Sequence, residues 1–332
     1  MTEELGAISA AIAAGESVRG TTSPNPPVGC ALVSASGELI ATGATSPAGG
    51  PHAEINALRQ AGARALGATA VVTLEPCNHT GRTGPCARAL VEAGVKRVVY
   101  FTADPNKAAA GGAAYLRDHG VEVDFQPVRV AALQPWLRSV RHGRPSVTLK
   151  FASTLDGFTA AADGTSQWIT GEAAREQVHE DRTKIDAIIV GTGTAIADDP
   201  SLTARFPDGT LRQHQPRRVV IGSREVPEGN LSRLGFEQYA TPHEALDALW
   251  HTGARDVLVE GGATLAASFF ELDLVDAVQA YIAPALLGAG RGVLDRAIAG
   301  TIADAYRFRT TAVRRVGNDV FIEMERDVYG TY

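Results

Sequence analysis

The first part of the chain alternates between helical and strand-like hydrophobic patterns. Leu5, Ile8 and Ile12 share one helical face after Thr2, which predicts an amphipathic helix over residues 2–18. Short apolar runs predict four strands, at residues 30–33, 70–74, 97–101 and 121–125. Three further helices are predicted between them, at residues 52–61, 86–94 and 113–118. Strands that alternate with helices are typical of a layered α/β domain.

A second alternation follows a break in the pattern. Residues 127–145 predict a connecting helix and linker, with Gly143-Arg144-Pro145 as the boundary. Strands are then predicted at residues 147–152, 187–190, 218–221, 256–260 and 278–282, with helices at 172–182, 243–250 and 264–272. A hairpin of residues 308–316 and 319–325 ends the pattern. We therefore expect two α/β domains, over residues 1–144 and 145–332.

Composition agrees with this organisation. A chain of 332 residues suits two domains of roughly 150 residues each. The net charge of −6 argues against non-specific binding to nucleic acid or membrane, although a few local arginines could bind a phosphorylated small molecule. The N-terminus has no basic and apolar leader pattern, and no apolar run reaches membrane-spanning length. Three cysteines do not suggest a disulfide framework, so we expect a reducing cytoplasm.

The strongest chemical signal is a Pro-His-Ala-Glu motif at residues 51–54, followed by Glu-Pro-Cys at 75–77 and by Cys86. One imidazole and two thiols leave one position of a zinc tetrahedron open, where zinc can lower the pKa of water toward about 7. This pattern is the signature of zinc deaminases, in which the Glu carries protons and does not bind metal. Helix starts at His52 and Cys86 would favour the thiolate form. Hydrolytic deamination is the predicted reaction.

Other interpretations of these residues stay open. A structural zinc site would need a fourth ligand, for which His79 is the nearest candidate, and a site without metal is also possible. Cys30 has no metal partner at a suitable spacing and is predicted to be a buried strand thiol. Eight residues separate Cys77 from Cys86, where nucleobase deaminases commonly have two. This loop of Arg, Thr, His and Gly indicates a phosphate-binding segment, or else a solvated surface loop.

The second half contains no Gly-x-Gly-x-x-Gly fingerprint. Instead, the strand predicted at residues 256–260 ends at Glu260, and two glycines lead into the next helix. This turn could offer free N–H groups to the phosphates of a dinucleotide, or could simply need glycine backbone. Segments at residues 150–157, 166–170, 191–194 and 197–205 add hydroxyls, acids, an aromatic ring and Arg205. Core or capping roles are the alternative for Trp168, Leu202 and Asp198.

Three segments, at residues 24–30, 51–54 and 73–83, resemble the deaminase half of the bifunctional bacterial riboflavin-biosynthesis deaminase/reductases. The segments of the second half resemble the reductase half, and both match in order along nearly the full chain. The resemblance implies a cytidine-deaminase-like three-layer domain followed by a dihydrofolate-reductase-like domain. It also implies deamination at C2 of 2,5-diamino-6-ribosylamino-4(3H)-pyrimidinone 5′-phosphate. NADPH would then reduce C1′ and open the ribosyl group to ribityl, giving 5-amino-6-(5-phosphoribitylamino)uracil.

The same resemblance implies roles for individual residues. Zinc would be held by His52, Cys77 and Cys86, and protons would be carried by Glu54. Substrate contacts would come from Asn25, His79, Arg82, Thr83, Asp104 and Asn106 in the first half, and from Ser166, Arg182, Leu202, Arg205 and Glu260 in the second. NADPH contacts would come from Ser153, Trp168, Thr194, Asp198, Ser223 and the turn Gly262, Ala263, Thr264, Leu265, Ala266, Ala267 and Ser268.

Four positions depart from the family pattern. Thr45 stands where a His is usual, Gly84-Pro85 replaces Pro-Pro, Lys107 ends the usual Asp-Pro-Asn-Pro, and Gly222 precedes Ser223 where Asp is usual. Two other functions are also kept: a nucleoside or tRNA-base deaminase with an accessory nucleotide-binding domain, and a non-catalytic nucleotide-binding protein. The reductase proton donor stays open among Lys150, Asp156 and Glu260. We also expect a homo-oligomer, paired through the C-terminal hairpin.

Overall fold

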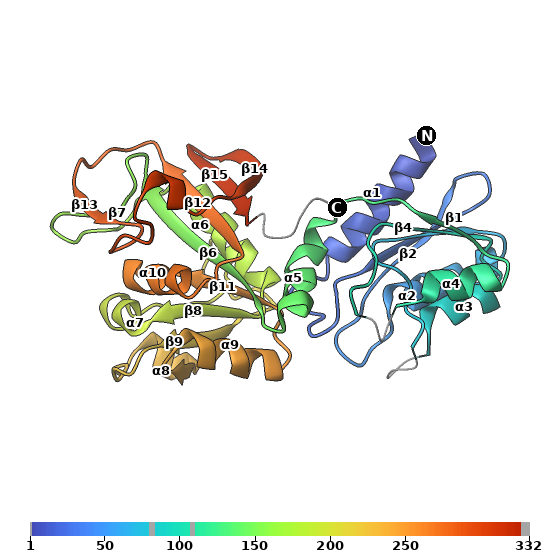
Figure 1. Ribbon diagram of the computed structural model, residues 1–332, viewed down its shortest axis with the longest axis horizontal. Coiled ribbons are helices and arrows are strands. Elements are labelled where there is room, and N and C mark those ends of the chain that lie inside the picture. Colours follow the sequence, from blue (N-terminus) through green and yellow to red (C-terminus); the bar gives the residue numbers. More distant parts are fainter. Residues whose placement is uncertain (1, 80–83, 107–109, 327–332) are drawn as a thin grey trace. The chain divides into compact units, whose positions relative to one another are not determined.

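The computed structural model describes residues 2–79, 84–106 and 110–326. The chain divides between Gly143 and Arg144 into two compact units, each built around its own β-sheet (Figure 1). Within the described residues, no helix is both long and apolar enough to cross a membrane.

The first unit surrounds a five-stranded sheet of order β2-β1-β3-β4-β5. The strand β1 pairs antiparallel with β2 and β3, whereas β3, β4 and β5 are parallel. The strands are β1 (Gly29–Val33), β2 (Leu39–Ala44), β3 (Thr69–Val72), β4 (Arg97–Tyr100) and β5 (Glu122–Phe125). The helices are α1 (Thr2–Glu16), α2 (Ala53–Ala61), α3 (Cys86–Glu92), α4 (Gly112–Asp118) and α5 (Gln134–His142), with short 3₁₀ turns at Gly62–Ala65 and Ala131–Leu133.

Two glycines show how this unit is layered. A Cβ at Gly29 would lie 1.9 Å from the carbonyl oxygen of Ala11 in α1, so this helix packs against bare backbone. A Cβ at Gly43 would lie 2.2 Å from the carbonyl oxygen of Ala53 in α2. Gly43 pairs across the sheet with Cys30, and successive residues of a strand face opposite sides. The helices α1 and α2 therefore cover opposite faces, which makes three layers.

The second unit contains an eight-stranded sheet of order β10-β9-β8-β11-β6-β12-β15-β14, together with the separate pair β7 and β13. The run from β10 to β12 is parallel, and β15 and β14 are added antiparallel. The strands are β6 (Ser146–Thr154), β7 (Phe158–Ala161), β8 (Ala187–Gly191), β9 (Arg217–Ile221), β10 (Glu237–Tyr239), β11 (Asp256–Glu260), β12 (Ala277–Ala283), β13 (Gly290–Gly292), β14 (Arg309–Val316) and β15 (Asp319–Glu325). The helices are α6 (Glu172–Asp181), α7 (Thr192–Asp198), α8 (Asn230–Leu234), α9 (Pro242–His251) and α10 (Ala263–Glu271), with 3₁₀ turns at Arg182–Lys184 and Ile302–Asp304.

Neighbouring residues of β8 face two different cores. Ile189 packs in a cluster with Leu249 of α9 and Phe269 of α10. Ile188 packs in another cluster that includes Ala195 of α7 and Leu231 of α8. Helices therefore cover both faces of the sheet, which explains why its parallel strands are almost continuously apolar. The carboxyl ends of these parallel strands form the edge where open α/β sheets bind ligands.

The predicted mixed α/β architecture is confirmed, and the long predicted elements are found with their ends shifted by a few residues. Several short elements were not predicted, namely β2, β7, β10, β13, α7 and α8. The missed helix α7 begins Thr-Gly-Thr, which are poor helix formers, and β13 is a three-residue Gly-Arg-Gly strand. The secondary structure of these segments is determined by tertiary contacts and not by local propensity.

Candidate functional site

Three potential metal ligands converge in the first unit from separate turns. His52 is the residue immediately before α2, Cys77 lies in the loop after β3, and Cys86 is the first residue of α3. The loop is held by backbone bonds, because the N–H of Ala87 donates to the carbonyl of Cys77 at 3.1 Å. The N–H of Cys86 donates to Cys77 Sγ at 3.4 Å. The predicted helix starts thus bring the three side chains together.

The geometry of this cluster fits zinc. His52 Nδ1 lies 3.5 Å from Cys77 Sγ and 3.4 Å from Cys86 Sγ, and the three ligand atoms lie within 4.8 Å of one another. Ligands at tetrahedral angles with the usual zinc–nitrogen and zinc–sulfur bond lengths are about 3.5 Å apart. Among the described residues, no fourth His, Cys, Asp or Glu joins the group. The donor set therefore suits a zinc ion with an open position.

Glu54 lies in the first turn of α2, two residues after His52, and is only 4 % exposed. Burial is the main cause that raises the pKa of Glu54 to about 7, with a further contribution from the charge of Cys77. Hydrogen bonding to Cys77 is the main cause that raises the pKa of His52. A buried carboxyl group with a pKa near neutrality can both accept and release a proton at physiological pH.

The loops around the cluster are anchored by side chain–backbone bonds. Glu75 accepts hydrogen bonds from the N–H groups of Gly111 at 3.2 Å and Ala113 at 3.1 Å, which fixes the start of α4. Asp104 accepts a bond from the N–H of Asn106 at 2.8 Å, and burial raises its pKa. Thr45, which departs from the family pattern, is buried and accepts a bond from the N–H of Val28 at 3.2 Å.

Two further predicted substrate residues of this unit, Asn25 and His79, lie in loops. Asn25 is half-buried and His79 is exposed. Arg82 and Thr83 lie outside the described residues. The geometry therefore locates the metal cluster more sharply than the surface that would hold the substrate.

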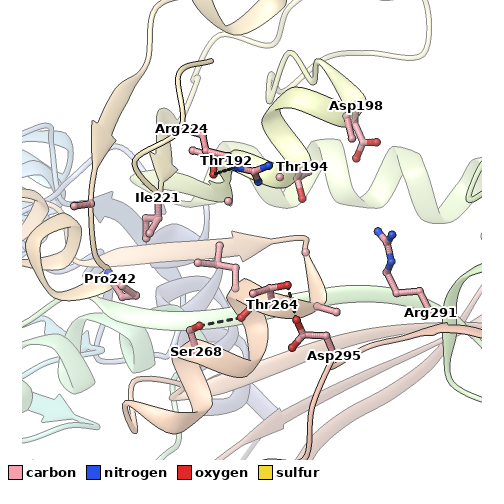
Figure 2. Close-up of a pocket in the computed structure, with 17 residues that line it drawn as sticks. Thr192, Thr194, Asp198, Ile221, Arg224, Pro242, Thr264, Ser268, Arg291 and Asp295 are labelled. Carbon is pink, nitrogen blue, oxygen red and sulfur yellow. Dashed lines mark hydrogen bonds between the residues drawn. The ribbon is translucent and has the colours of Figure 1, made fainter. Parts of the chain in front are cut away.

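Two adjoining cavities open at the carboxyl edge of the second sheet. The larger, of about 690 Å³, lies between the turn after β8, the end of β9 and the start of α10 (Figure 2). The smaller, of about 450 Å³, is lined by β6, the end of β11 and part of α7. Both are lined by Thr194, Ala197, Asp198, Gly262, Ala263 and Arg291, so these residues mark where the cavities meet.

The smaller cavity contains a buried ion cluster. Arg182 donates from Nε and Nη2 to the two carboxylate oxygens of Glu260, at 2.9 and 2.8 Å. Its Nη1 donates to the carbonyl of Thr203 at 2.9 Å. Lys150 Nζ lies 3.7 Å from Glu260 Oε2. These three bonds leave two of the five guanidinium N–H groups of Arg182 for other acceptors.

The larger cavity fits a dinucleotide phosphate. Gly262, immediately before α10, has a φ of 78°, and a Cβ there would lie 3.2 Å from Thr194 Oγ1. A side chain at this position would be strained and crowded. Within the part of the chain that the structure describes, no side chain caps α10, so its first N–H groups are free to bind an anion. The cavity thus has the backbone donors that NADPH needs for its diphosphate.

Most predicted reductase residues lie in these cavities. The larger is lined by Thr194, Asp198, Gly262, Ala263, Thr264, Leu265 and Ser268, and the smaller by Ser166, Arg182, Leu202, Glu260 and Ala266. The residues that line neither are Ser153, Trp168, Arg205, Ser223 and Ala267. Trp168 is 68 % exposed, and the guanidinium of Arg175 lies 4.6 Å from its ring centroid.

Sequence reasoning missed three charged residues that line the larger cavity: Arg224, Arg291 and Asp295. Arg224 follows the carboxyl end of β9, and this position could have drawn attention to it. Arg291 lies in β13, and Asp295 follows this strand in a loop without hydrophobic periodicity. No sequence signal marked these last two residues.

Comparisons with known proteins agree with this organisation. Residues 1–102 match the cytidine and deoxycytidylate deaminase zinc-binding region, and residues 145–322 match the RibD C-terminal domain. The chain is 60% identical over 307 residues to riboflavin biosynthesis protein RibD of Corynebacterium ammoniagenes, covering 90% of this chain and 91% of that protein. It is 39% identical to RibD of Escherichia coli, and the match covers 92% of this chain and 95% of that protein.

Solved structures are similar over nearly the whole chain. Acinetobacter baumannii RibD superimposes with a TM-score of 0.83 at 38% identity, covering 98% of this chain and 99% of that one. A Thermotoga maritima diaminohydroxyphosphoribosylaminopyrimidine deaminase/5-amino-6-(5-phosphoribosylamino)uracil reductase superimposes with a TM-score of 0.84 at 31% identity, with the same coverage. On this similarity of sequence and structure along its length, the chain belongs to the RibD family of riboflavin-biosynthesis enzymes.

Proposed function

We propose that this chain catalyses two consecutive steps of riboflavin biosynthesis, one in each unit. Residues 1–144 would deaminate 2,5-diamino-6-ribosylamino-4(3H)-pyrimidinone 5′-phosphate by hydrolysis, and residues 145–332 would reduce the ribosyl group of the product with NADPH. The observation that carries the proposal is the presence of two different centres in one chain. One is an open three-ligand cluster beside a buried carboxyl group, and the other is a cavity with a glycine turn and free N–H groups.

In the deaminase, His52, Cys77 and Cys86 would hold zinc, which supplies the Lewis acidity that activates water at neutral pH. Glu54 accepts one proton from the attacking water at its carboxylate and gives it to the ring nitrogen, and it then carries the second proton of that water to the departing amino group. Its pKa of about 7 suits both directions of transfer near neutrality. Asn25, His79, Arg82, Thr83, Asp104 and Asn106 are the proposed substrate contacts.

In the reductase, NADPH supplies the hydride for C1′ of the ribosyl group. Ser166, Arg182, Leu202 and Glu260 are the proposed contacts to the substrate in the smaller cavity. Ser153, Trp168, Thr194, Asp198, Ser223 and residues 262–268 are the proposed contacts to NADPH. The cavity walls described above support the central members of both sets.

Lys150 is the proton donor that we favour among three candidates. The Glu260 carboxyl group has a pKa of about 2, because the charges of Arg182 and Lys150 outweigh the opposite effect of burial. Asp156 accepts bonds from Thr154 Oγ1 at 2.6 Å and from the N–H of Gly288 at 2.7 Å, which lower its pKa. Both acids therefore stay ionised at neutral pH, whereas the Lys150 ammonium borders the smaller cavity and carries protons.

Arg205 supports a phosphorylated substrate. Its Nη1 donates to Ser201 Oγ at 3.1 Å, and among the described residues it forms no ion pair with a carboxylate. Burial and then the nearby charge of Arg182 lower its pKa. A cation held close to another cation is stabilised when a phosphate arrives. Arg205 is therefore the proposed site of the substrate 5′-phosphate.

Three further expectations belong to this proposal. A small phosphorylated pyrimidine as the partner, rather than nucleic acid, agrees with the net charge of −6. A reducing cytoplasm agrees with the free thiols of all three cysteines. A homo-oligomer would pair through the edge strand β14, where Val313 is 64 % exposed. Sedimentation equilibrium of the purified chain measures this last point.

The decisive experiment supplies the diaminopyrimidinone phosphate to the purified chain with and without NADPH. We expect ammonia release in both cases and NADPH oxidation only after deamination. Turnover of cytidine or of tRNA adenosine, without turnover of the diaminopyrimidinone, would favour a nucleoside or tRNA deaminase instead. A zinc-free chain that carries out neither reaction would favour a non-catalytic nucleotide-binding protein.

A further inference from the structure

The two ends of the larger cavity have different surroundings (Figure 2). One end is shared with the smaller cavity and contains Thr194, Asp198 and Arg291. If the smaller cavity holds the sugar, as the proposed function requires, hydride transfer needs the nicotinamide ring at this shared end. The orientation of the cofactor in the cavity follows from this requirement.

The rest of the cofactor then follows the cavity wall. The N–H groups at the start of α10, next to Gly262, are placed to bind the diphosphate in the middle of the cavity. The adenosine half consequently reaches the opposite end. This end is lined by Thr192, Ile221, Arg224 and Pro242. NADPH differs from NADH only by a 2′-phosphate on this adenosine, so the distinction between them is made here.

Among the described residues that line this end, Arg224 is the cation, and its backbone is held in place. Gln238 Nε2 donates to the carbonyl oxygens of Gly222 at 2.7 Å and of Arg224 at 2.9 Å, which fixes the turn after β9. Arg224 Nε donates to Thr192 Oγ1 at 3.4 Å, and this contact directs the guanidinium along the cavity wall. Among the described residues no carboxylate forms an ion pair with Arg224. Its remaining N–H groups are free for an anion.

The turn before Arg224 carries no acid in this chain, because Gly222 stands where the family usually has Asp. A carboxylate beside Arg224 would compete with a phosphate for its guanidinium. Gly222 has a φ of 128°, and a Cβ there would lie 2.6 Å from Thr192 Oγ1. Any side chain at residue 222 is therefore strained and crowded, and no Asp or Glu is among the described residues that line this end. The local charge is positive.

We propose that Arg224 binds the 2′-phosphate of NADPH and sets the preference of the reductase for NADPH over NADH. Guanidinium groups bind phosphate with two parallel N–H bonds, which gives Arg224 the geometry for this role. The proposal rests on the assignment of the second unit as a reductase, and it adds the residue that selects the cofactor.

The test measures the dissociation constants of the full-length chain for NADPH and for NADH, by fluorescence titration without substrate. Arg224→Ala should weaken NADPH binding on the order of 10- to 100-fold, the loss expected for hydrogen bonds to a charged group. Binding of NADH should change little. Arg224→Lys should retain part of the preference, because it keeps the charge but not the paired N–H groups. Added salt should weaken NADPH binding less in Arg224→Ala than in the parent.

Arg291→Ala is the matched control, because Arg291 lines the opposite end of the same cavity. It should change the two dissociation constants by the same factor. An NADPH preference that is unchanged in correctly folded Arg224→Ala, judged by circular dichroism, would overturn the role of Arg224 and leave the reductase assignment intact. A parent chain that binds neither cofactor would overturn the reductase assignment itself.

Discussion

The guanidinium of Arg182 binds both carboxylate oxygens of Glu260, and the two side chains are only 12 and 11 % exposed. Burial would raise the pKa of Glu260, but Arg182 and then Lys150 reverse this effect and bring it to about 2. The Glu260 carboxyl group thus stays ionised inside the smaller cavity, next to the position proposed for the sugar. The folded protein tolerates this buried charge because Arg182 pairs with it, since an unpaired buried charge is unfavourable.

The first prediction concerns this pair. Arg182→Met should lower the free energy of unfolding of the reductase unit by about 3–5 kcal/mol, because it leaves Glu260 buried with a more distant cation. Urea unfolding measures the loss. Arg296→Met is the control, since Arg296 Nε binds Glu271 Oε1 at 2.7 Å on the surface. Its loss should change the free energy of unfolding by less than about 1 kcal/mol. Equal losses in both variants would contradict the role of burial.

The second prediction concerns pH and His179. Its Nδ1 lies 3.0 Å from the carbonyl oxygen of Thr203. Burial, and then the charges of Arg182 and Arg205, lower its pKa from 6.5 to about 4. As the pH falls, the unfolded chain therefore takes up a proton at His179 before the folded chain does. The contribution of neutral His179 to the free energy of unfolding is complete above pH 6.5 and is lost as the pH falls to about 4. For a half-buried side chain, we expect a loss of about 1–2 kcal/mol.

His179→Gln should remove this part of the pH dependence. His243→Gln, in the exposed first turn of α9, should retain it. The measurement is the free energy of unfolding at several pH values between 7 and 4, compared with the parent chain. The same slope in His179→Gln and the parent would show that other groups cause the dependence.

The convergence of His52, Cys77 and Cys86 could be predicted from sequence because its signals are local. His52 and Cys86 were each expected at a helix start, and the structure has them at the starts of α2 and α3. The glycine turn at Gly262 was predicted for the same reason, since a strand, two glycines and a helix are contiguous. Residue type and nearest neighbours were sufficient in both cases.

The cavity walls could not be predicted, because they depend on contacts between distant segments. Arg224 reaches Thr192 only because β8 and β9 are neighbours in the sheet. Arg291 lines the cavity from β13, whose pairing with β7 has no sequence signal, and its charge acts on Asp198. Arg182 was expected to contact the substrate, and its bonds to Glu260, a residue 78 positions away, were not foreseen.

The third prediction tests the proton carrier. Glu54→Gln should lower deamination by about 10²- to 10⁴-fold, because the amide cannot accept and return a proton. Zinc content should be unchanged, since Glu54 is not part of the three-ligand cluster. NADPH-dependent reduction of substrate that has already been deaminated should also be unchanged. Loss of both activities would contradict independent centres, and retained deamination would exclude the role of Glu54.

The fourth prediction concerns the metal. Cys86→Ser should bind less zinc than the parent, lose deamination and lower the unfolding temperature of the first unit, because the cluster retains only two strong ligands. Metal analysis per chain and thermal unfolding measure these effects. Cys30→Ala is the matched control, since it removes a buried thiol of β1 outside the cluster and should retain zinc. Equal zinc loss in both variants would contradict the assigned ligands.

The fifth prediction tests how tightly α4 supports the metal loop. A Cβ at Gly112, the first residue of α4, would lie 1.7 Å from the carbonyl oxygen of Pro76, next to the ligand Cys77. Gly112→Ala must therefore displace the helix or the loop, and we expect a loss of about 1–3 kcal/mol and faster removal of zinc by a chelator.

Gly6→Ala is the control for this substitution. Gly6 lies in α1, and apart from the neighbouring helix backbone no heavy atom of the described residues lies within 4 Å of a Cβ built there, so alanine should stabilise the helix by about 0.5–1 kcal/mol. Thermal unfolding and the rate of zinc release distinguish the two variants. If Gly112→Ala keeps the zinc and the unfolding temperature of the parent, the loop that carries Cys77 can move without cost. In that case α4 does not position the ligand.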